Sequence, residues 1–477
     1  MENWLEKRIA LSPDKTAIVT KEDSLTYREL GKRVEIWMRH LATVIEKDSF
    51  VGVLVNNSLM GYITILALQQ LNCTLVMLNK RLSADELQFQ INDTNLKVVI
   101  YEDGLLKNKR LTMVNCFSFT AIENLAVTPV AAVADFKDEH VTTLMYTSGT
   151  TRKPKGVCQT FRNHFYSAVG SAFNLGLSTD DNWLCVVPLF HISGFSIMMR
   201  ALLYGMTVTL VNQFDAKAVN KILVENKISA ISVVPTMLQQ LIINQNLQKY
   251  NPKFRFFLLG GGPIDLHLLE ICQKRNWPVI QSYGMTETAS QVVALNFEDA
   301  QQKIGSVGKT LFPVALKIAT DGEILLNAPN ITPGYYQLPL QNKTSFENGW
   351  FKTGDIGYLD KEGFLYLRGR KGDMIISGGE NIFPDEIEAV YYNLKDIVQI
   401  VVAGVPDSKW GSVPVAFIQT KGMMSKSFLR DYGYQHLAHF KVPHRFYLVS
   451  DYPRTASGKI KRQYLSQHKQ YFSNELY

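Results

Sequence analysis

The chain has 477 residues, more than one domain usually holds, so we expect at least two domains. Hydrophobic residues make up 46% and charged residues 19%, which fits a globular protein and excludes a disordered one. The net charge of +7 is spread along the chain, so it suits small anionic substrates and gives no indication of a nucleic-acid partner.

The five cysteines share no close spacing, and we therefore expect buried thiols in a reducing compartment rather than disulfides or a zinc site. The N-terminus lacks the apolar segment of a secretory signal. No uninterrupted apolar stretch reaches the roughly 18 residues that a membrane helix needs. These features predict a cytoplasmic protein without membrane insertion.

The first part of the chain alternates strand and helix patterns. Residues 25–45 carry apolar positions at helical spacing, with Ser24 or Thr26 as the N-cap and Glu29 close by. Strands are expected at 51–55, 74–78, 97–101 and 141–146, with helices at 57–71 and 83–92. Such alternation predicts a parallel sheet covered on both faces by helices.

The same alternation continues further along the chain. Strands are expected at 184–189, 207–211, 228–234, 254–259 and 279–282. From about Ile304, glycine, proline and short alternating runs predict a β-rich segment with strands at 314–318, 323–326 and 364–367. A helix begun by Pro384 and strands at 398–403 and 413–418 then predict a small α+β domain.

The predicted fold class is therefore α/β with two domains. A large N-terminal domain over residues 1–370 holds βαβ-type sheets and the small β-rich segment. The charged, glycine-flanked pair Lys371-Gly372 is the expected hinge. A small, mobile α+β domain follows over residues 373–477.

The segment 146–157 reads Tyr-Thr-Ser-Gly-Thr-Thr-Arg-Lys-Pro-Lys-Gly-Val. An apolar run stops there at a loop of hydroxyl residues, glycine and cations, which are the groups that hold a polyphosphate. The spacing is not that of the Walker loop. The alternative interpretation is a solvated turn between a strand and a helix.

Two further motifs end predicted strands. Residues 282–288 read Ser-Tyr-Gly-Met-Thr-Glu-Thr and place a ring, a hydroxyl and a carboxylate close together, which suits a base, a phosphate and a hydrated Mg²⁺. Residues 260–262 are three glycines, which let the backbone lie against a flat or crowded group. The alternatives are an ordinary strand-ending turn at the first and a tight turn at the second.

Charged residues complete the set of candidates. Asp355, after an aromatic pair, could take the two hydroxyls of a ribose, and Arg370 could pair with the same sugar or a phosphate. Lys459 follows a Ser-Gly turn and is a mobile point charge. Taken singly, each is equally a surface charge or part of a basic tail.

In this combination and order, the motifs resemble the adenylate-forming superfamily, which includes acyl-CoA synthetases, luciferases and peptide-synthetase adenylation domains. The resemblance runs from the segment 25–30 to Lys459. It implies a reaction in two steps. A carboxylate attacks the α-phosphorus of ATP to give an acyl-adenylate and pyrophosphate, and the thiol of coenzyme A then displaces AMP.

The resemblance also implies a role for each motif. The nucleotide would be held by Thr147, Ser148, Gly149, Thr150, Thr151, Lys155, Gly261, Tyr283, Thr286, Asp355 and Arg370. Glu287 would hold Mg²⁺. Lys459 would bridge the attacking carboxylate and the α-phosphate, where negative charge accumulates in the transition state. The catalytic set would be Lys459, Thr286, Glu287 and His191. Rotation about Lys371 and Gly372 would separate the two half-reactions.

The sequence departs from the superfamily at two positions. Arg152 stands in the phosphate loop where the family usually has glycine, so its side chain must point outward or the loop must shift. Gly372 stands at the hinge position, which is commonly Asp or Lys. We expect this glycine to make the rotation easier but less directed.

The acyl substrate is indicated by residues 188–195, Pro-Leu-Phe-His-Ile-Ser-Gly-Phe, and the apolar helix that follows them. Arg200 is the one charge in that helix, and burying an isolated cation is costly. It could reach the surface, pair with an internal acid, or bind a second carboxylate of the substrate. The segments 188–195, 259–264, 283–291 and 304–309 resemble the branch that joins 2-succinylbenzoate to coenzyme A in menaquinone (vitamin K2) biosynthesis. That resemblance implies substrate contacts from Ser193, Arg200 and Thr236.

Three alternatives remain open at this stage. The chain could be another aryl or medium-chain acyl-CoA ligase, which the role of Arg200 would distinguish. It could be an adenylation module that loads a separate carrier protein, or a silent nucleotide-binding protein, against which Lys155, Glu287 and Lys459 argue. The sequence also leaves homo-oligomer formation open.

Overall fold

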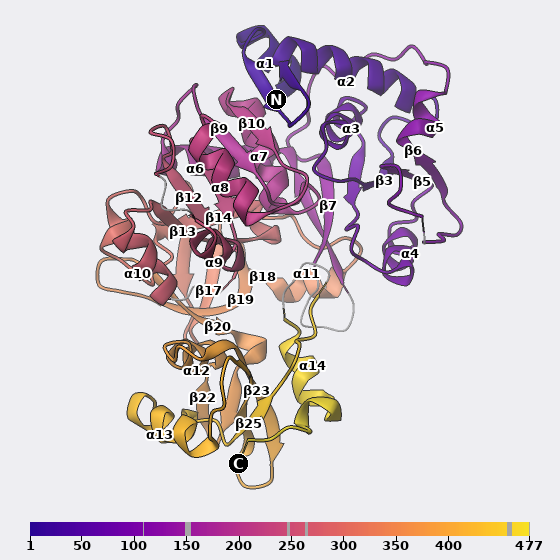
Figure 1. The fold of residues 1–477 in the computed structure, drawn as a ribbon. Helices are drawn as coiled ribbons and strands as arrows, with labels where there is room; N and C mark the ends of the chain where they lie inside the picture. The colour runs from indigo at the N-terminus through magenta and orange to yellow at the C-terminus, as the bar shows by residue number, and fades with distance from the viewer. Residues whose placement is uncertain (108, 148–153, 246–248, 263–265, 456–459, 477) are drawn as a thin grey trace.

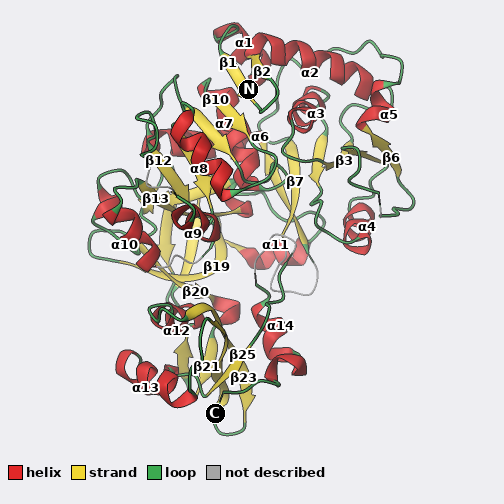
Figure 2. Cartoon of the chain, in the orientation of Figure 1, coloured by secondary structure: helices red, strands yellow, loops and turns green. Residues whose placement is uncertain are grey.

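The structure is a computed structural model that describes residues 1–107, 109–147, 154–245, 249–262, 266–455 and 460–476 (Figures 1 and 2). It has the predicted α/β fold. Sheets and helices of the large N-terminal part fill the upper two thirds of Figure 1, and residues after the hinge form the orange and yellow part below. Within the described residues, no helix combines the length and apolar character needed to cross a membrane.

The first sheet has the strand order β6-β5-β3-β4-β7-β8. Its strands are β3 (Phe50–Leu54), β4 (Thr74–Met77), β5 (Val98–Tyr101), β6 (Asn115–Ser118), β7 (Val141–Thr147) and β8 (Lys155–Thr160). They are parallel except for the antiparallel pair β7 and β8. The accompanying helices are α2 (Tyr27–Leu41), α3 (Leu59–Gln70), α4 (Ala84–Asp93) and α5 (Phe119–Glu123). Local signals start two of them, because Thr26 with Glu29 and Ser83 with Glu86 form capping boxes.

The second sheet has the order β15-β14-β13-β12-β11-β9-β10-β1-β2. Its inner strands are β1 (Thr16–Val19), β9 (Asn182–Cys185), β10 (Thr207–Leu210), β11 (Ala230–Val233), β12 (Phe256–Leu259) and β13 (Val279–Met285), all parallel. Antiparallel β2 (Ser24–Thr26), β14 (Ser290–Ala294) and β15 (Lys309–Thr310) close its edges. The helices are α1 (Trp4–Leu11), α6 (Phe161–Leu175), α7 (Ile192–Tyr204), α8 (Ala216–Glu225), α9 (Pro235–Ile243) and α10 (Leu266–Lys274).

One large apolar core joins the two sheets. It contains side chains of α2, α3 and α7 together with strand residues from both sheets, such as Val53, Met145 and Val208. Helix α7 therefore lies in the interior, and ten of its residues are buried. This position places the helix that carries Arg200 between the two sheets.

The β-rich segment forms a separate antiparallel sheet. It contains β16 (Ala315–Ile318), β17 (Glu323–Asn327), β18 (Phe346–Glu347), β19 (Trp350–Leu359) and β20 (Leu365–Arg370), with the short helix α11 (Pro339–Ser345). The residues beyond it have cores of their own, which hold only side chains from Ile375 onward. These cores surround β21 (Ile375–Ser377), β22 (Glu380–Ile382), β23 (Ile397–Asp407), β24 (Gly411–Thr420) and β25 (Arg445–Leu448), with helices α12 (Pro384–Tyr391), α13 (Lys426–His436) and α14 (Arg462–Gln467).

Two local expectations were wrong. The segment after the 148–153 loop is a strand rather than a helix, because residues 155–160 pair back onto β7 and the chain turns into α6 only at Phe161. The motif 282–288 does not simply follow a strand, since β13 continues through Met285 and pairs with β14. Residues of mixed polarity there are fixed by pairing with neighbouring strands, which periodicity does not report.

Candidate active site

The predicted nucleotide residues gather where strands end. Thr147 ends β7 and pairs across the strands with Lys155, the first residue of β8. Tyr283 lies in the last part of β13, and Thr286 and Glu287 follow in a 3₁₀ turn. This is the carboxyl edge of parallel strands, where such folds place ligands. The predicted phosphate-loop residues Ser148, Gly149, Thr150 and Thr151, and also Arg152, lie outside the described residues.

Tyr283, Asp355 and Arg370 form one bonded cluster. The Tyr283 hydroxyl donates to Asp355 Oδ2 at 2.7 Å, and Arg370 Nε lies 2.7 Å from Asp355 Oδ1. Antiparallel pairing of β19 with β20 sets Asp355 opposite Arg370. Burial and the neighbouring carboxylate raise the pKa of Tyr283 well above its ordinary value, so its hydroxyl stays neutral. Each carboxylate oxygen keeps a second lone pair that can accept from a sugar hydroxyl.

Tyr335 is a site residue that sequence reasoning missed. Its hydroxyl donates to Glu287 Oε1 at 3.0 Å, and Lys155 Nζ lies 5.2 Å from the centre of its ring. Burial lowers the pKa of Lys155, and the Glu287 carboxylate opposes that shift. A bridge between Val157 and Tyr335 brings these segments together. Only the glycine-tyrosine-tyrosine run at 334–336 could have drawn attention to this position, and its partner is not visible in the sequence.

The residues around Glu287 fit a magnesium ion. Tyr335 occupies one carboxylate oxygen and orients the side chain, so the other oxygen can face a hydrated ion. Mg²⁺ is commonly bound by one or two carboxylates together with substrate phosphates and water, and Glu287 beside the β7 and β8 ends matches that donor set.

Helix α7 carries the acyl-site candidates. His191 is its N-cap residue, and its carbonyl accepts from Gly194 and Phe195, which fixes the first turn. Ser193 is half-buried in that turn. Arg200 lies two turns further along and is only 1% exposed.

The surroundings of Arg200 contain little to balance its charge. Nη2 donates to the Ser290 hydroxyl at 3.2 Å, and the guanidinium lies 5.5 Å from the ring centre of Trp183. Nε is buried and has no hydrogen-bond partner. No carboxylate forms a salt bridge with Arg200 among the residues that the structure describes. Burial lowers the pKa of the guanidinium, although a side chain of this type remains protonated.

Thr236 and Gly261 lie on neighbouring loops. Thr236 is exposed in the first turn of α9, directly after β11, and Gly261 follows β12 with φ of +83°. A Cβ added to Gly261 would lie 3.4 Å from a Val234 methyl group. The two loops are therefore adjacent, but Thr236 is not buried as Arg200 is.

The hinge candidates are held by ion pairs. Lys371 Nζ lies 2.6 Å from Asp321 and 2.8 Å from Glu323, both in the β-rich segment, and bonds to these carboxylates raise its pKa. The Gly372 carbonyl accepts from Gln463 at 3.3 Å. Lys459 lies outside the described residues.

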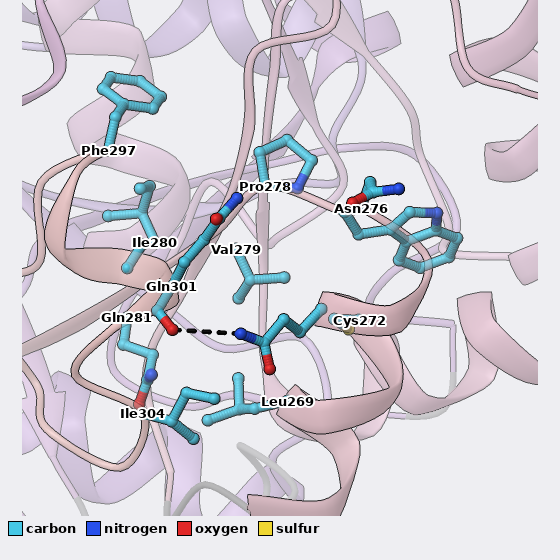
Figure 3. Close-up of a pocket in the computed structure, with 13 residues that line it drawn as sticks. Leu269, Cys272, Asn276, Pro278, Val279, Ile280, Gln281, Phe297, Gln301 and Ile304 are labelled. Atoms are coloured by element: carbon cyan, nitrogen blue, oxygen red, sulfur yellow. Dashed lines mark hydrogen bonds between the residues drawn. The ribbon is translucent and has the colours of Figure 1, made fainter.

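A small pocket lies away from these groups (Figure 3). It is bounded by α10, the first part of β13 and the 297–304 segment, and its floor carries apolar side chains such as Val279 and Ile304. It contains none of the predicted site residues. The pocket is at the opposite end of β13 from Tyr283, so we do not assign the reaction to it.

The fold and the bonded groups at the strand ends define a nucleotide-activating enzyme with a separate C-terminal unit. The chain belongs to the AMP-binding enzyme family: the model of that family matches residues 5–336, and the model of its C-terminal domain matches residues 386–459.

Its relatives narrow the class. The chain is 46% identical to the 2-succinylbenzoate–CoA ligase of Listeria monocytogenes serotype 4b, over 98% of this chain and 99% of the relative. It is also similar to o-succinylbenzoate CoA synthetase from Bacillus subtilis in complex with its acyl-adenylate intermediate, with 38% identity, 98% of each chain covered and a TM-score of 0.93. The same Bacillus enzyme in complex with ATP and magnesium ion matches with 39% identity, 97% and 99% coverage and a TM-score of 0.93.

Proposed function

We propose that this protein is a cytoplasmic ligase that joins 2-succinylbenzoate to coenzyme A in menaquinone biosynthesis. ATP activates the acid as an acyl-adenylate with release of pyrophosphate, and the thiol of coenzyme A then displaces AMP. Curated relatives with that activity are 46% identical over nearly the whole chain. The observation in this structure that carries the choice of acid is the buried Arg200 without a carboxylate partner.

Arg200 explains why the acid should carry two carboxylates. A buried cation is strongly unfavourable unless an anion and hydrogen bonds compensate it. Neither alternative interpretation of this residue fits, because the side chain does not reach the surface and no internal acid pairs with it among the described residues. The second carboxylate of 2-succinylbenzoate supplies the missing charge and can accept from the unpartnered Nε. A fatty acid would leave that cation uncompensated.

The nucleotide is held at the strand ends. Asp355 accepts from ribose hydroxyls while Arg370 and Tyr283 keep its carboxylate in place. Lys155 and the loop before it contact the β- and γ-phosphates, and Tyr335 orients Glu287 toward the metal. Bound Mg²⁺ would neutralise phosphate charge there.

The first half-reaction needs a cation between the attacking carboxylate and the α-phosphate, because charge builds up on those oxygens. We assign that role to Lys459, on the unit formed by residues 373–477. Rotation of this unit about Lys371 and Gly372 would withdraw Lys459 before coenzyme A attacks. The two ion pairs of Lys371 hold the hinge in the arrangement seen here.

The choice of acid is tested by pyrophosphate release with ATP and Mg²⁺. We expect 2-succinylbenzoate to exceed benzoate, octanoate and amino acids by a wide margin, and 2-succinylbenzoyl-CoA to form when coenzyme A is added. A wide margin in favour of octanoate or an amino acid would overturn the substrate. Pyrophosphate release without thioester formation would instead indicate transfer to a carrier protein.

The role of Lys459 is tested by separating the half-reactions. Lys459→Ala should lose adenylation but still form the thioester from supplied acyl-adenylate, because only the first step needs its charge. Equal loss of both half-reactions would contradict the rotation. Lys461→Ala, two residues further along, is the matched control.

A further inference from the structure

A buried polar chain connects the core beside α7 to the Thr286–Glu287 turn. It begins at His164, passes through Thr143 and Gln159, and ends on the backbone carbonyl of Thr286. The three side chains are 2%, 0% and 0% exposed, although they lie in an otherwise apolar interior. Buried polar groups cost free energy unless they are bonded, so a chain of three calls for an explanation.

The direction of every bond in this chain is fixed by chemistry. Gln159 Nε2 donates to the Thr286 carbonyl at 2.6 Å, because a carbonyl can only accept. The amide oxygen therefore faces Thr143, whose hydroxyl donates to it at 2.8 Å. That hydroxyl has one proton, so His164 Nε2, at 3.3 Å, must donate to it. Burial lowers the pKa of His164 to about 3, which keeps the ring neutral.

The chain orients groups and does not conduct protons. The Gln159 amide is not a proton carrier at neutral pH, and it interrupts any path from His164 to Thr286. What the chain does fix is the distance between β8 and the turn. Lys155 and Gln159 are on the same strand, so one short strand carries both a phosphate-binding cation and the group that holds the Thr286 carbonyl.

The turn itself needs external support. Ala289 and Ser290 have φ of +50° and +113°, which are unfavourable for residues with side chains. Successive carbonyls of the turn accept from different elements. Those of Thr286, Glu287, Thr288 and Ala289 are bonded to Gln159, the Thr332 amide, Asn330 and Ser167. Gln159 is the one of these donors that belongs to the strand after the phosphate loop.

We propose that Gln159 is a positioning residue for catalysis, oriented by Thr143, that holds the Thr286–Glu287 turn at a fixed distance from the phosphate-binding strand. The proposal rests on the proposed function, since it assumes that both segments bind the same nucleotide. It does not depend on which acid is activated. Misplacement of a catalytic group by about 1 Å costs up to roughly 10²-fold in rate, so loss of the Gln159 bond should be visible in kinetics.

The chain offers a matched control. Thr142 is the neighbour of Thr143 on β7 and is equally buried, but its hydroxyl accepts from Gln69 of α3 rather than from the polar chain. Thr142→Val and Thr143→Val therefore remove the same atom from the same strand. Both should lower the melting temperature, and only the second should release the Gln159 amide from its orientation.

The experiment measures kcat/KM for ATP in pyrophosphate release, the melting temperature, and the rise in melting temperature on adding ATP and Mg²⁺. We expect Gln159→Met and Thr143→Val to lower kcat/KM by roughly 10- to 10²-fold and to reduce the ATP-induced rise. Thr143→Ser keeps the hydroxyl and should restore both, while Thr142→Val should match the parent protein in both.

The proposal is overturned if Gln159→Met keeps the parent kcat/KM, or if Thr142→Val loses as much as Thr143→Val at the same melting temperature. Failure of the proposed function has a different signature. In that case the parent protein releases no pyrophosphate with any acid, and the ATP-induced rise in melting temperature still compares the variants.

Discussion

Arg200 in the N-terminal part and Arg462 in the C-terminal part are both largely withdrawn from solvent, and their surroundings are opposite. Arg200 has a hydroxyl and an aromatic ring as neighbours and no carboxylate among the described residues. Arg462 contacts Glu388, bonds to Asp385 at 2.6 Å and lies 3.9 Å from Asp373. Charge is therefore in deficit around one arginine and in excess around the other.

The difference separates structure from binding. Burial alone would lower the pKa of Arg462, but Glu388 and Asp385 raise it, so that cation is compensated within the chain. Arg462 begins α14, and its carboxylates lie on α12 and next to the hinge, so it ties the segment after Lys459 to the base of its domain. Arg200 has no such partner and is explained by an anion that arrives with the substrate.

The largest expected effect comes from removing Arg462. Arg462→Met leaves two buried carboxylates without their cation, and breaking a buried pair in this way costs about 3–5 kcal/mol. Denaturant unfolding should show this loss in the free energy of unfolding. Arg200→Met should be neutral or stabilising in the absence of substrate, because it replaces an uncompensated charge by an apolar chain. Equal losses in the two variants would break the comparison.

A second effect concerns pH. Burial raises the pKa of Glu388 to about 7 from its ordinary value of 4.5, because the Arg462 cation only partly offsets burial and the neighbouring Asp385. The folded protein therefore binds this proton more tightly than the unfolded chain. Its contribution to stability is complete below about pH 4.5 and is lost as pH rises to about 7, a change on the order of 3 kcal/mol.

Glu388→Gln should abolish that slope. Urea unfolding between pH 4.5 and 8 measures it, and Glu386→Gln, an exposed carboxylate on the same helix, is the control. If the parent protein instead gains stability over the same range, Arg462 dominates the titration of Glu388 and the cluster is not over-supplied with negative charge.

Features that depend on neighbouring residues could be read from the sequence. Thr26 with Glu29 and Pro384 with its acidic first turn predicted helix starts that the structure confirms. The order of strands and helices was sufficient for the α/β fold, and the ordered motifs were sufficient for the family.

Contacts between distant segments could not be read in this way. Gln159 looked like an ordinary polar residue, and its bond to Thr286 spans 127 positions. Tyr335 meets Glu287 across 48 positions through a β-bridge that no periodicity announces. The lack of a partner for Arg200 is likewise a property of packing, so the sequence could pose that question without answering it.

A third prediction tests Arg200 in function. Arg200→Met should raise the KM for 2-succinylbenzoate by roughly 10- to 150-fold, since a charge-assisted hydrogen bond contributes about 1.5–3 kcal/mol. The KM for ATP should change little, because Arg200 contacts none of the nucleotide residues directly. Benzoate, which has one carboxylate, is the control substrate and should be nearly indifferent to the change. A parallel rise in the KM for ATP would mean that Arg200 acts through Ser290 and the turn.

The smallest effect is expected at Lys371, which tests whether burial or the number of carboxylates sets the energy. Lys371 has two carboxylates within 2.8 Å but is 46% exposed, so water already solvates it. Lys371→Ala should lower the free energy of unfolding by less than about 1 kcal/mol, close to the effect of Lys352→Ala, a comparable surface pair with Glu347. A loss as large as that of Arg462→Met would show that contact number outweighs desolvation, and the contrast between the two arginines would then need another cause.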